Sequence, residues 1–167
     1  MIAVILYFIC MAVLIAADQL TKLWVVKNLI KLGSMSVVGD FLKFSYVTNT
    51  GAAFSRLQGK MALLIAVSLI LSAVCIGVII SRKLDSVLGD ISLVLISAGG
   101  IGNLIDRVAR GYVVDFIDLN TIHFAIFNVA DSCVTVGVVL FVIFVLMREA
   151  SVGRRKPKSD IFTRRRF

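Results

Sequence analysis

The sequence predicts an all-α integral membrane protein, in which four transmembrane helices carry a small β-sheet between the first helix and the second. Two observations predict this fold class. Hydrophobic residues make up 59% of the 167 positions, charged residues make up 17%, and the mean hydropathy is +1.00, a composition outside the usual range for soluble domains. The chain also contains long uncharged runs, at 1–17, 61–80, 91–105 and 132–147. We therefore expect one membrane domain over residues 1–150 and a basic tail at 151–167.

The four helices are expected at 2–24, 60–81, 87–106 and 129–148. A transmembrane helix needs about 20 predominantly apolar residues, and only the second uncharged run reaches that length alone. The other runs must take in flanking polar residues, among them Asp18 and Asp131, which are expected near a membrane boundary. The first run could instead be a cleaved signal peptide, although no basic stretch precedes it.

The connection between the first two helices is expected to form β structure over residues 35–56. Within 41–47 the apolar side chains Leu42, Phe44 and Tyr46 alternate with polar ones, and turn residues stand at both ends of this stretch. This pattern predicts a small sheet at the membrane surface. Trp24 and Tyr46 are suitable interfacial anchors at the level of the lipid headgroups.

The distribution of basic residues predicts the orientation. Four spans place both termini on one side, and the tail together with Arg82 and Lys83 makes that side basic, which is typical of the cytoplasm. The long connections 18–60 and 106–131 would then face outward. The first of them holds six basic residues and argues partly against this orientation, but long loops follow the charge rule less strictly. Most of the net charge of +8 lies in the tail, for which anionic membrane lipid is a better partner than nucleic acid.

Residues 106–131 hold four carboxylates between two apolar segments. Carboxylates at membrane depth are costly and are therefore candidates for function. Asp115 is the most unusual of the four, because it stands between Val114 and Phe116 and has no basic residue within four positions. Burial should raise its pKa. No chemistry is assigned to Asp118.

Two of these carboxylates also have a purely structural interpretation. Asp131 lies at the expected start of the fourth helix, where free amides and the helix dipole favour a carboxylate cap. Asp106 could pair with Arg107 or Arg110 at the water interface. Taken one at a time, the structural role is the more common for each.

Taken together, Asp115 and Asp131 could share a proton and activate a water molecule, as the two carboxyls of aspartic proteases do. The amides of Asn49, Asn103 and Asn128 could hold a peptide backbone, and Arg107 could orient a carbonyl or carboxylate. A serine triad is disfavoured, because His123 is the one histidine and no Gly-x-Ser-x-Gly turn occurs. The scattered cysteines do not supply a zinc site, so we expect neither a metal nor a cofactor.

The order of the motifs resembles that of the lipoprotein signal peptidases, the bacterial signal peptidase II family. The resemblance covers nearly the whole chain. No single motif block identifies the family, but the blocks together, in this order, are highly specific. Its five blocks are Asp18-Gln19-Leu20-Thr21-Lys22-Leu23-Trp24, Asn49-Thr50-Gly51-Ala52-Ala53-Phe54, Gly102-Asn103-Leu104-Ile105-Asp106-Arg107, Gly111-Tyr112-Val113-Val114-Asp115-Phe116-Ile117-Asp118 and Phe127-Asn128-Val129-Ala130-Asp131-Ser132.

This resemblance implies an intramembrane aspartic endopeptidase with an extracytoplasmic β-cradle. Such enzymes remove signal peptides from prolipoproteins, cutting before a diacylglyceryl-modified cysteine, and are targets of the cyclic peptide globomycin. The family's catalytic pair falls on Asp115 and Asp131. Its supporting or substrate-contacting positions fall on Asp18, Lys22, Asn49, Gly102, Asn103, Arg107, Asn128 and Ala130.

The resemblance also implies a location, a multi-pass protein of the bacterial cytoplasmic membrane with both termini in the cytoplasm and the active site near the outer face. The connection 116–130 is short for the family, which leaves the shape of that loop open.

Three rival functions remain from the residues alone. A proton-coupled transporter would use the same aspartates but should have polar residues at mid-span, whereas spans two and four are almost wholly apolar there. A non-catalytic membrane scaffold would not require asparagine and aspartate to converge. A presenilin-type protease would have an aspartate where Asn103 follows Gly102.

Overall fold

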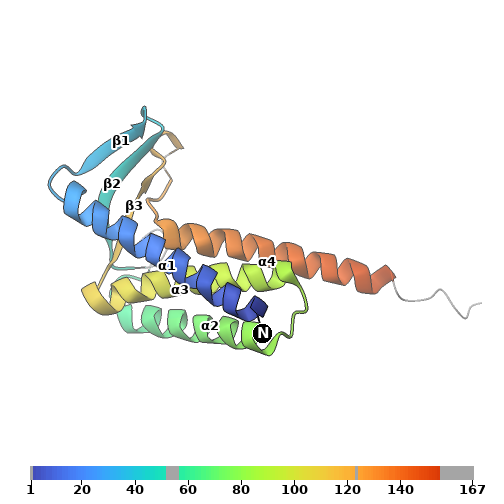
Figure 1. Ribbon diagram of the computed structural model, residues 1–167. Coiled ribbons are helices and arrows are strands. Elements are labelled where there is room, and N and C mark those ends of the chain that lie inside the picture. The colour runs from blue at the N-terminus through green and yellow to red at the C-terminus, as the bar shows by residue number, and fades with distance from the viewer. Residues whose placement is uncertain (1, 52–56, 123, 155–167) are drawn as a thin grey trace, which may run out of the picture.

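The protein is a bundle of four long helices with a small sheet at one end (Figure 1). In this computed structural model, residues 2–51, 57–122 and 124–154 are described. The helices are α1 (Ile2–Leu29), α2 (Met61–Ser81), α3 (Val87–Arg110) and α4 (Val129–Arg154). Within the described residues, these four helices are long and apolar enough to cross a membrane. The predicted fold class is confirmed.

Helix α1 continues well beyond the end predicted at residue 24, because its last turns have a second packing partner. Val25 and Leu29 are buried against Val114 and Phe116 of the sheet. The chain then leaves the helix through Gly33, whose N–H donates to the Leu29 carbonyl at 2.8 Å and whose φ of +76° suits glycine. The end of α1 is therefore the support on which the sheet lies.

Helix α3 is the central helix of the bundle and packs against the other three. Its first turn is capped by the Ser86 hydroxyl oxygen, which accepts a hydrogen bond from the Gly89 N–H at 3.3 Å. Its last turn ends at Gly111 in the left-handed conformation, with the Gly111 N–H donating to the Arg107 carbonyl at 3.1 Å. These caps set the length of the helix that carries Asn103, Asp106 and Arg107.

Two glycines let α3 approach its neighbours closely. A Cβ atom on Gly102 would lie 2.7 Å from Asp18 Oδ2 on α1 and 3.1 Å from Ala130 Cβ on α4. A Cβ on Gly99 would collide with the Ala130 carbonyl and come within 2.7 Å of Val134 Cγ2. Small residues at such crossings are typical of packed membrane helices, and here they bring three helices together at the level of Asp18 and Ala130.

The sheet has three antiparallel strands in the order β1 (Ser34–Val38), β2 (Leu42–Asn49) and β3 (Val113–Asp118). The first two lie between α1 and α2 as predicted, and residues 52–56 of the expected β region fall outside the described residues. The third strand, which follows α3, was not predicted. Its pairing with β2 shifts between Phe44 and Val47, and beyond that shift Val47 stands opposite Asp115.

Aromatic side chains fasten the sheet to α1. Phe44 contacts Trp24 edge-on, with ring centroids 6.3 Å apart, and contacts Phe116 in the same manner at 5.5 Å. The sheet therefore holds β3 against the bundle, directly above the start of α4 (Figure 1). The interfacial role of Trp24 and Tyr46 stays a prediction.

Candidate active site

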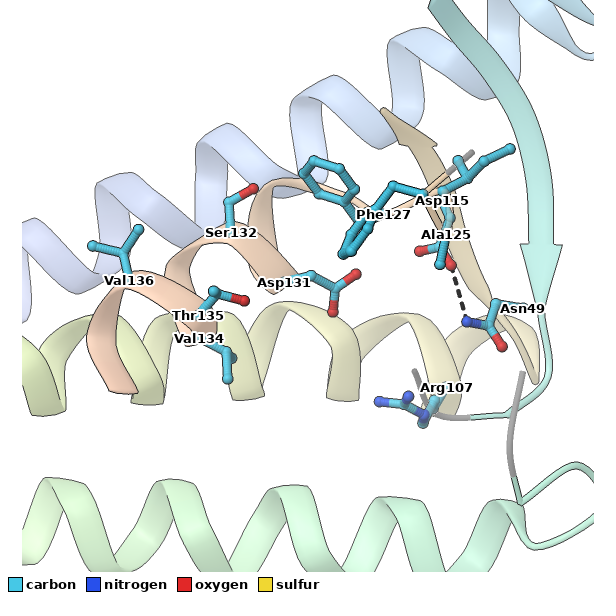
Figure 2. A pocket seen from close by; sticks show the side chains of 12 residues that line it. Asn49, Arg107, Asp115, Ala125, Phe127, Asp131, Ser132, Val134, Thr135 and Val136 are labelled. Carbon is cyan, nitrogen blue, oxygen red and sulfur yellow. Dashed lines mark hydrogen bonds between the residues drawn. The ribbon is translucent and has the colours of Figure 1, made fainter. Parts of the chain in front are cut away.

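A cavity of about 480 Å³ opens where the sheet meets α3 and α4. Asp115 and Asp131 both line it, and Figure 2 shows their carboxyl groups on facing walls, one from β3 and one from α4. The remaining lining residues are Asn49, Arg107, Phe124, Ala125, Ile126, Phe127, Ser132, Val134, Thr135 and Val136. The structure thus brings together two carboxylates that are separated by a loop in the sequence.

Asp115 is 3% exposed and accepts one hydrogen bond on each carboxylate oxygen. Asn49 Nδ2 donates to Oδ2 at 2.9 Å, and Asn128 Nδ2 donates to Oδ1 at 2.6 Å. Burial raises the pKa of the Asp115 carboxyl to about 6, and the charge of Asp131 adds to the rise, whereas the two amide donors oppose it. The upward shift predicted from its apolar neighbours is confirmed.

Asp131 caps α4 and faces the cavity at the same time. Asn128 is the residue before the helix, and its side-chain Oδ1 accepts from the Asp131 N–H at 2.9 Å, while Asp131 Oδ2 accepts from the Asn128 N–H at 3.3 Å. This reciprocal pair is a capping box with aspartate in the third helical position. The other oxygen, Oδ1, accepts from Asn103 Nδ2 at 2.8 Å. The two interpretations of Asp131 are therefore compatible.

A fully buried lysine fixes the orientation of Asn103. Lys22 is 0% exposed, and its Nζ donates to Asn103 Oδ1 at 2.9 Å. Because the amide oxygen of Asn103 faces the ammonium group, its nitrogen must face Asp131. Asn128 Nδ2 adds a contact to the same oxygen at 3.2 Å. Lys22 thus acts on Asp131 through Asn103.

Lys22 is neutralised by two buried carboxylates from different helices. Its Nζ lies 2.9 Å from Asp18 Oδ2 on α1 and 3.0 Å from Asp106 Oδ2 on α3. Asp18 Oδ1 also accepts from the Ala130 N–H at 2.9 Å, so this carboxylate holds the first turn of α4. The two ion pairs and the hydrogen bond to Asn103 offset the free energy that is needed to remove the Lys22 ammonium group from water.

The expected position of Asp106 at the water interface is wrong, whereas its expected pairing with Arg110 is found as a long ion pair. It was placed at the water interface beside Arg107 or Arg110, but it is 0% exposed, and its partners are Lys22 and the Val114 N–H, which donates to Oδ2 at 3.2 Å. Arg110 Nε is more distant, at 3.9 Å from Oδ1. Asp106 therefore joins α1, α3 and the start of β3, because α1 packs against α3 and brings Lys22 beside it.

Arg107 lines the cavity from α3. Its Nη2 donates to the Gly51 carbonyl at 3.1 Å, just beyond the end of β2. Its Nη1 is 3.5 Å from the Asn103 carbonyl. In Figure 2 the guanidinium lies on the same side of the cavity as Asn49, below the two carboxylates. This position is suitable for binding a carbonyl group that approaches them.

Several residues of the site were not singled out from the sequence. Gln19 Nε2 donates to Asp18 Oδ2 and to the Gly102 carbonyl, both at 3.1 Å. Its position inside the first motif block was the one sequence feature that could have indicated a role in the site. The apolar wall, formed by residues such as Phe127 and Val134, gave no signal, because such side chains are ordinary in a membrane helix and a loop.

Every residue predicted from the sequence for the site lies at the cavity or in the hydrogen-bonded shell behind it. Asp118, to which no chemistry was assigned, is absent from the cavity wall and accepts a hydrogen bond from the Ser45 hydroxyl at 3.0 Å. His123 falls outside the described residues. In the described ranges, no group of three or more His, Cys, Asp or Glu side chains is arranged to hold a metal ion.

Comparison with known proteins gives a consistent result. The family model for signal peptidase (SPase) II matches residues 10–147. A protein from Clostridioides difficile named lipoprotein signal peptidase is 38% identical over 145 residues, which are 87% of this chain and 97% of that protein. One of the same name from Enterococcus faecalis is 37% identical over 152 residues, covering 91% and 94% of the two chains.

Solved structures agree in the fold. A bacterial membrane enzyme determined by the in meso method at 2.3 Å resolution aligns with a TM-score of 0.79 and 33% identity, over 93% of each chain. A second bacterial membrane enzyme, at 1.9 Å resolution, aligns with a TM-score of 0.74 and 35% identity, over 84% of this chain and 92% of that one.

Proposed function

The chain belongs to the signal peptidase II family, and from this premise we propose that it cleaves prolipoproteins just before the diacylglyceryl-modified cysteine, using Asp115 and Asp131 as an aspartic dyad. Processing of prolipoproteins is the work of the family, and its four apolar helices fit a bacterial membrane protein. The cleavage position and the two-aspartate mechanism are our proposal.

One observation carries the mechanism, namely that two carboxylates in different environments face one cavity. Asp115 is held in an apolar surrounding with a pKa of about 6, whereas Asp131 is bound at a helix start. Paired carboxyls whose environments differ can take separate acid and base roles. Asp115 would hold the shared proton and donate a hydrogen bond to the oxyanion, while Asp131 takes a proton from the attacking water.

The asparagines keep both carboxylates in position for that step. Asn49 and Asn128 hold the two oxygens of Asp115, and Asn103 and the Asn128 backbone hold those of Asp131. Each oxygen accepts one such hydrogen bond, which leaves it a lone pair for water or for the shared proton. Lys22 and Asp18 act as positioning residues behind this layer.

The remainder of the cavity is suited to an extended peptide with apolar side chains. Arg107 would bind a substrate carbonyl, and Phe127, Val134 and Val136 would contact the small or apolar residues that precede the cysteine. The acyl chains could remain in lipid, because the cavity lies at the ends of spanning helices. The Asn49 amide, which lines the cavity, would replace a hydrogen bond that the substrate loses when its helix unwinds. Asn128 is 0% exposed and serves Asp115 and the start of α4 instead.

The proposed orientation places the sheet and the cavity on the outer face, with both termini in the cytoplasm. The support is twofold. The end of α2, which Arg82 and Lys83 follow, is remote from the sheet (Figure 1), and the sequence after residue 150 is strongly basic. Globomycin should compete for the cavity. We expect membrane lipid and prolipoprotein as partners and no nucleic acid.

The test is cleavage of a diacylglyceryl-modified precursor by the detergent-solubilised protein. Asp115→Asn and Asp131→Asn should abolish cleavage while the variants remain folded, because each removes a carboxylate that the dyad requires. Asp118→Asn is the matched control, since Asp118 belongs to the same strand as Asp115 and contacts Ser45 instead of the cavity. A chelator should have no effect. Folded dyad variants that still cleave would refute the mechanism.

A further inference from the structure

A second polar cavity, of about 160 Å³, lies at the end of the bundle opposite the sheet. It forms where α1 begins, α2 ends and α3 begins, and its polar lining residues include Tyr7, Arg82, Asp85 and Asp90. In Figure 1 this end carries the N-terminus and the connection between α2 and α3, at the opposite end of the helices from the sheet. The cleavage mechanism gives this cavity no role.

Asp90 is the buried charged residue of this cavity. It is 4% exposed, and its Oδ1 is buried without a hydrogen-bond partner among the described residues. The Tyr7 hydroxyl interacts with the carboxylate, but Asp90 forms no ion pair with any residue in the described ranges. A buried carboxylate oxygen without a donor is unfavourable. A ligand that donates a hydrogen bond to Asp90 Oδ1 would remove this unfavourable state, and a cationic donor would also pair with the carboxylate charge.

The other lining groups restrict the chemistry of that donor. A divalent cation would need six or more oxygen ligands, and two carboxylates without a third cannot supply a cage. Arg82, an exposed residue of the lining, is a cation that would repel a simple ammonium ion but would attract an anion attached to it. Carboxylate and guanidinium together match a molecule with an ammonium group and a phosphate.

Size and location indicate the source of such a molecule. At about 30 Å³ for each water-sized group, the cavity has room for roughly five such groups, enough for an ethylammonium end with the phosphate at the mouth. The ends of spanning helices lie at the level of the lipid headgroups. We propose that this cavity binds the headgroup of an aminophospholipid, with the ammonium group on Asp90 and the phosphate on Arg82.

The test is lipid binding to the full chain, measured by native mass spectrometry in detergent. Phosphatidylethanolamine should bind more tightly than phosphatidylcholine, whose quaternary ammonium has no N–H, and more tightly than phosphatidylglycerol, which has no ammonium. Asp90→Asn should weaken phosphatidylethanolamine binding by about tenfold or more, because a hydrogen bond to a charged group is lost. Arg82→Gln should also weaken it.

Lys83→Gln is the matched control, because it removes the same charge one residue away and Lys83 is absent from the lining. Each variant should retain cleavage activity, which verifies its fold. Tyr7→Phe provides a milder change if Asp90→Asn does not fold. It removes a hydroxyl that interacts with the Asp90 carboxylate, so this variant should bind phosphatidylethanolamine more tightly than the wild type, and weaker binding would count against the proposal.

Equal binding by wild type and Asp90→Asn would overturn the proposal, as would equal binding of phosphatidylcholine and phosphatidylethanolamine. Displacement of the lipid by an equal concentration of free phosphoethanolamine would assign the cavity to a soluble ligand and overturn the lipid as its occupant.

Discussion

Replacing Asn49 by alanine should move the alkaline limb of the pH–rate profile upward. In the proposed mechanism the active dyad carries one proton, held by Asp115, so kcat/KM declines as the pH rises through the pKa of that carboxyl, about 6. The Asn49 amide donates to the charged form at 2.9 Å and lowers this pKa. Without the amide the proton is held more tightly, and the active form persists to higher pH.

The magnitude follows from the hydrogen bond. A bond to a charged group contributes about 1.5–3 kcal/mol, and a pKa difference of one corresponds to about 1.4 kcal/mol. The limb should therefore move from about 6 in the wild type to roughly 7 or 8 in Asn49→Ala. The maximal rate should fall at the same time, because Asp115 loses a positioning contact.

The free energy of unfolding should also depend on the protonation of Asp115. The folded pKa of Asp115 lies above its ordinary value of 3.8, so the protonated carboxyl favours the folded state at low pH, and this contribution is lost as the pH rises through about 6. For the wild type the loss amounts to about 3 kcal/mol well above that pH. In Asn49→Ala the loss should be larger and should occur at higher pH.

The assay is kcat/KM for a lipidated precursor, measured from about pH 4 to about pH 9 so that both limbs of the profile are covered. Asn120→Ala is the control, because its amide donates to the Asp40 carbonyl at the outer end of the sheet, away from the cavity. An alkaline limb that stays in place, or moves downward, in a folded Asn49→Ala variant would show that Asp115 does not hold the catalytic proton.

Three further perturbations test the shell behind the dyad. Lys22→Met removes the buried cation that Asp18 and Asp106 share and should lower the free energy of unfolding by about 3–5 kcal/mol; an unchanged thermal unfolding temperature would contradict this. Gly102→Ala places a Cβ 2.7 Å from Asp18 Oδ2 and should reduce kcat by about tenfold or more, whereas Gly77→Ala, with nothing within 4 Å of its Cβ, should not. Asn128→Ala removes the α4 cap, at a cost of about 1 kcal/mol, and should lower kcat far more than that loss of stability explains, which paired melting and rate measurements would detect.

The burial and the raised pKa of one site carboxylate could be predicted from local sequence. Asp115 stands out because its apolar neighbours imply burial, and its raised pKa agrees. Asn49, Asn103 and Asn128 were proposed from the residues as amides that hold a peptide backbone, and the family's motifs gave them supporting positions. Their roles as donors to two particular carboxylates depend on which amide nitrogen faces which oxygen.

The errors arose where distant segments meet. Asp106 was expected to pair with neighbouring arginines because they are near in sequence, and Arg110 does pair with it at 3.9 Å, but its closer partner, Lys22, is on another helix. Strand β3 was missed although residues 113–117 are rich in β-branched and aromatic types. A six-residue strand is stable only when it pairs with another strand, and its partner β2 is distant in the sequence. The packing of α1 against α3 determines the partner of Asp106, and the pairing with β2 determines that residues 113–118 form a strand.

The sequence by itself determined the spanning helices, the polar blocks and the identities of the two carboxylates, because hydropathy over about 20 residues and the cost of charge in lipid are local properties. The tertiary structure decided how those carboxylates are placed. The unpredicted third strand carries Asp115, and Gly99 and Gly102 let three helices meet, so that a capping aspartate on α4 faces a buried one on β3. Hydrogen bonds and ion pairs depend on distances between segments, and close packing fixes those distances.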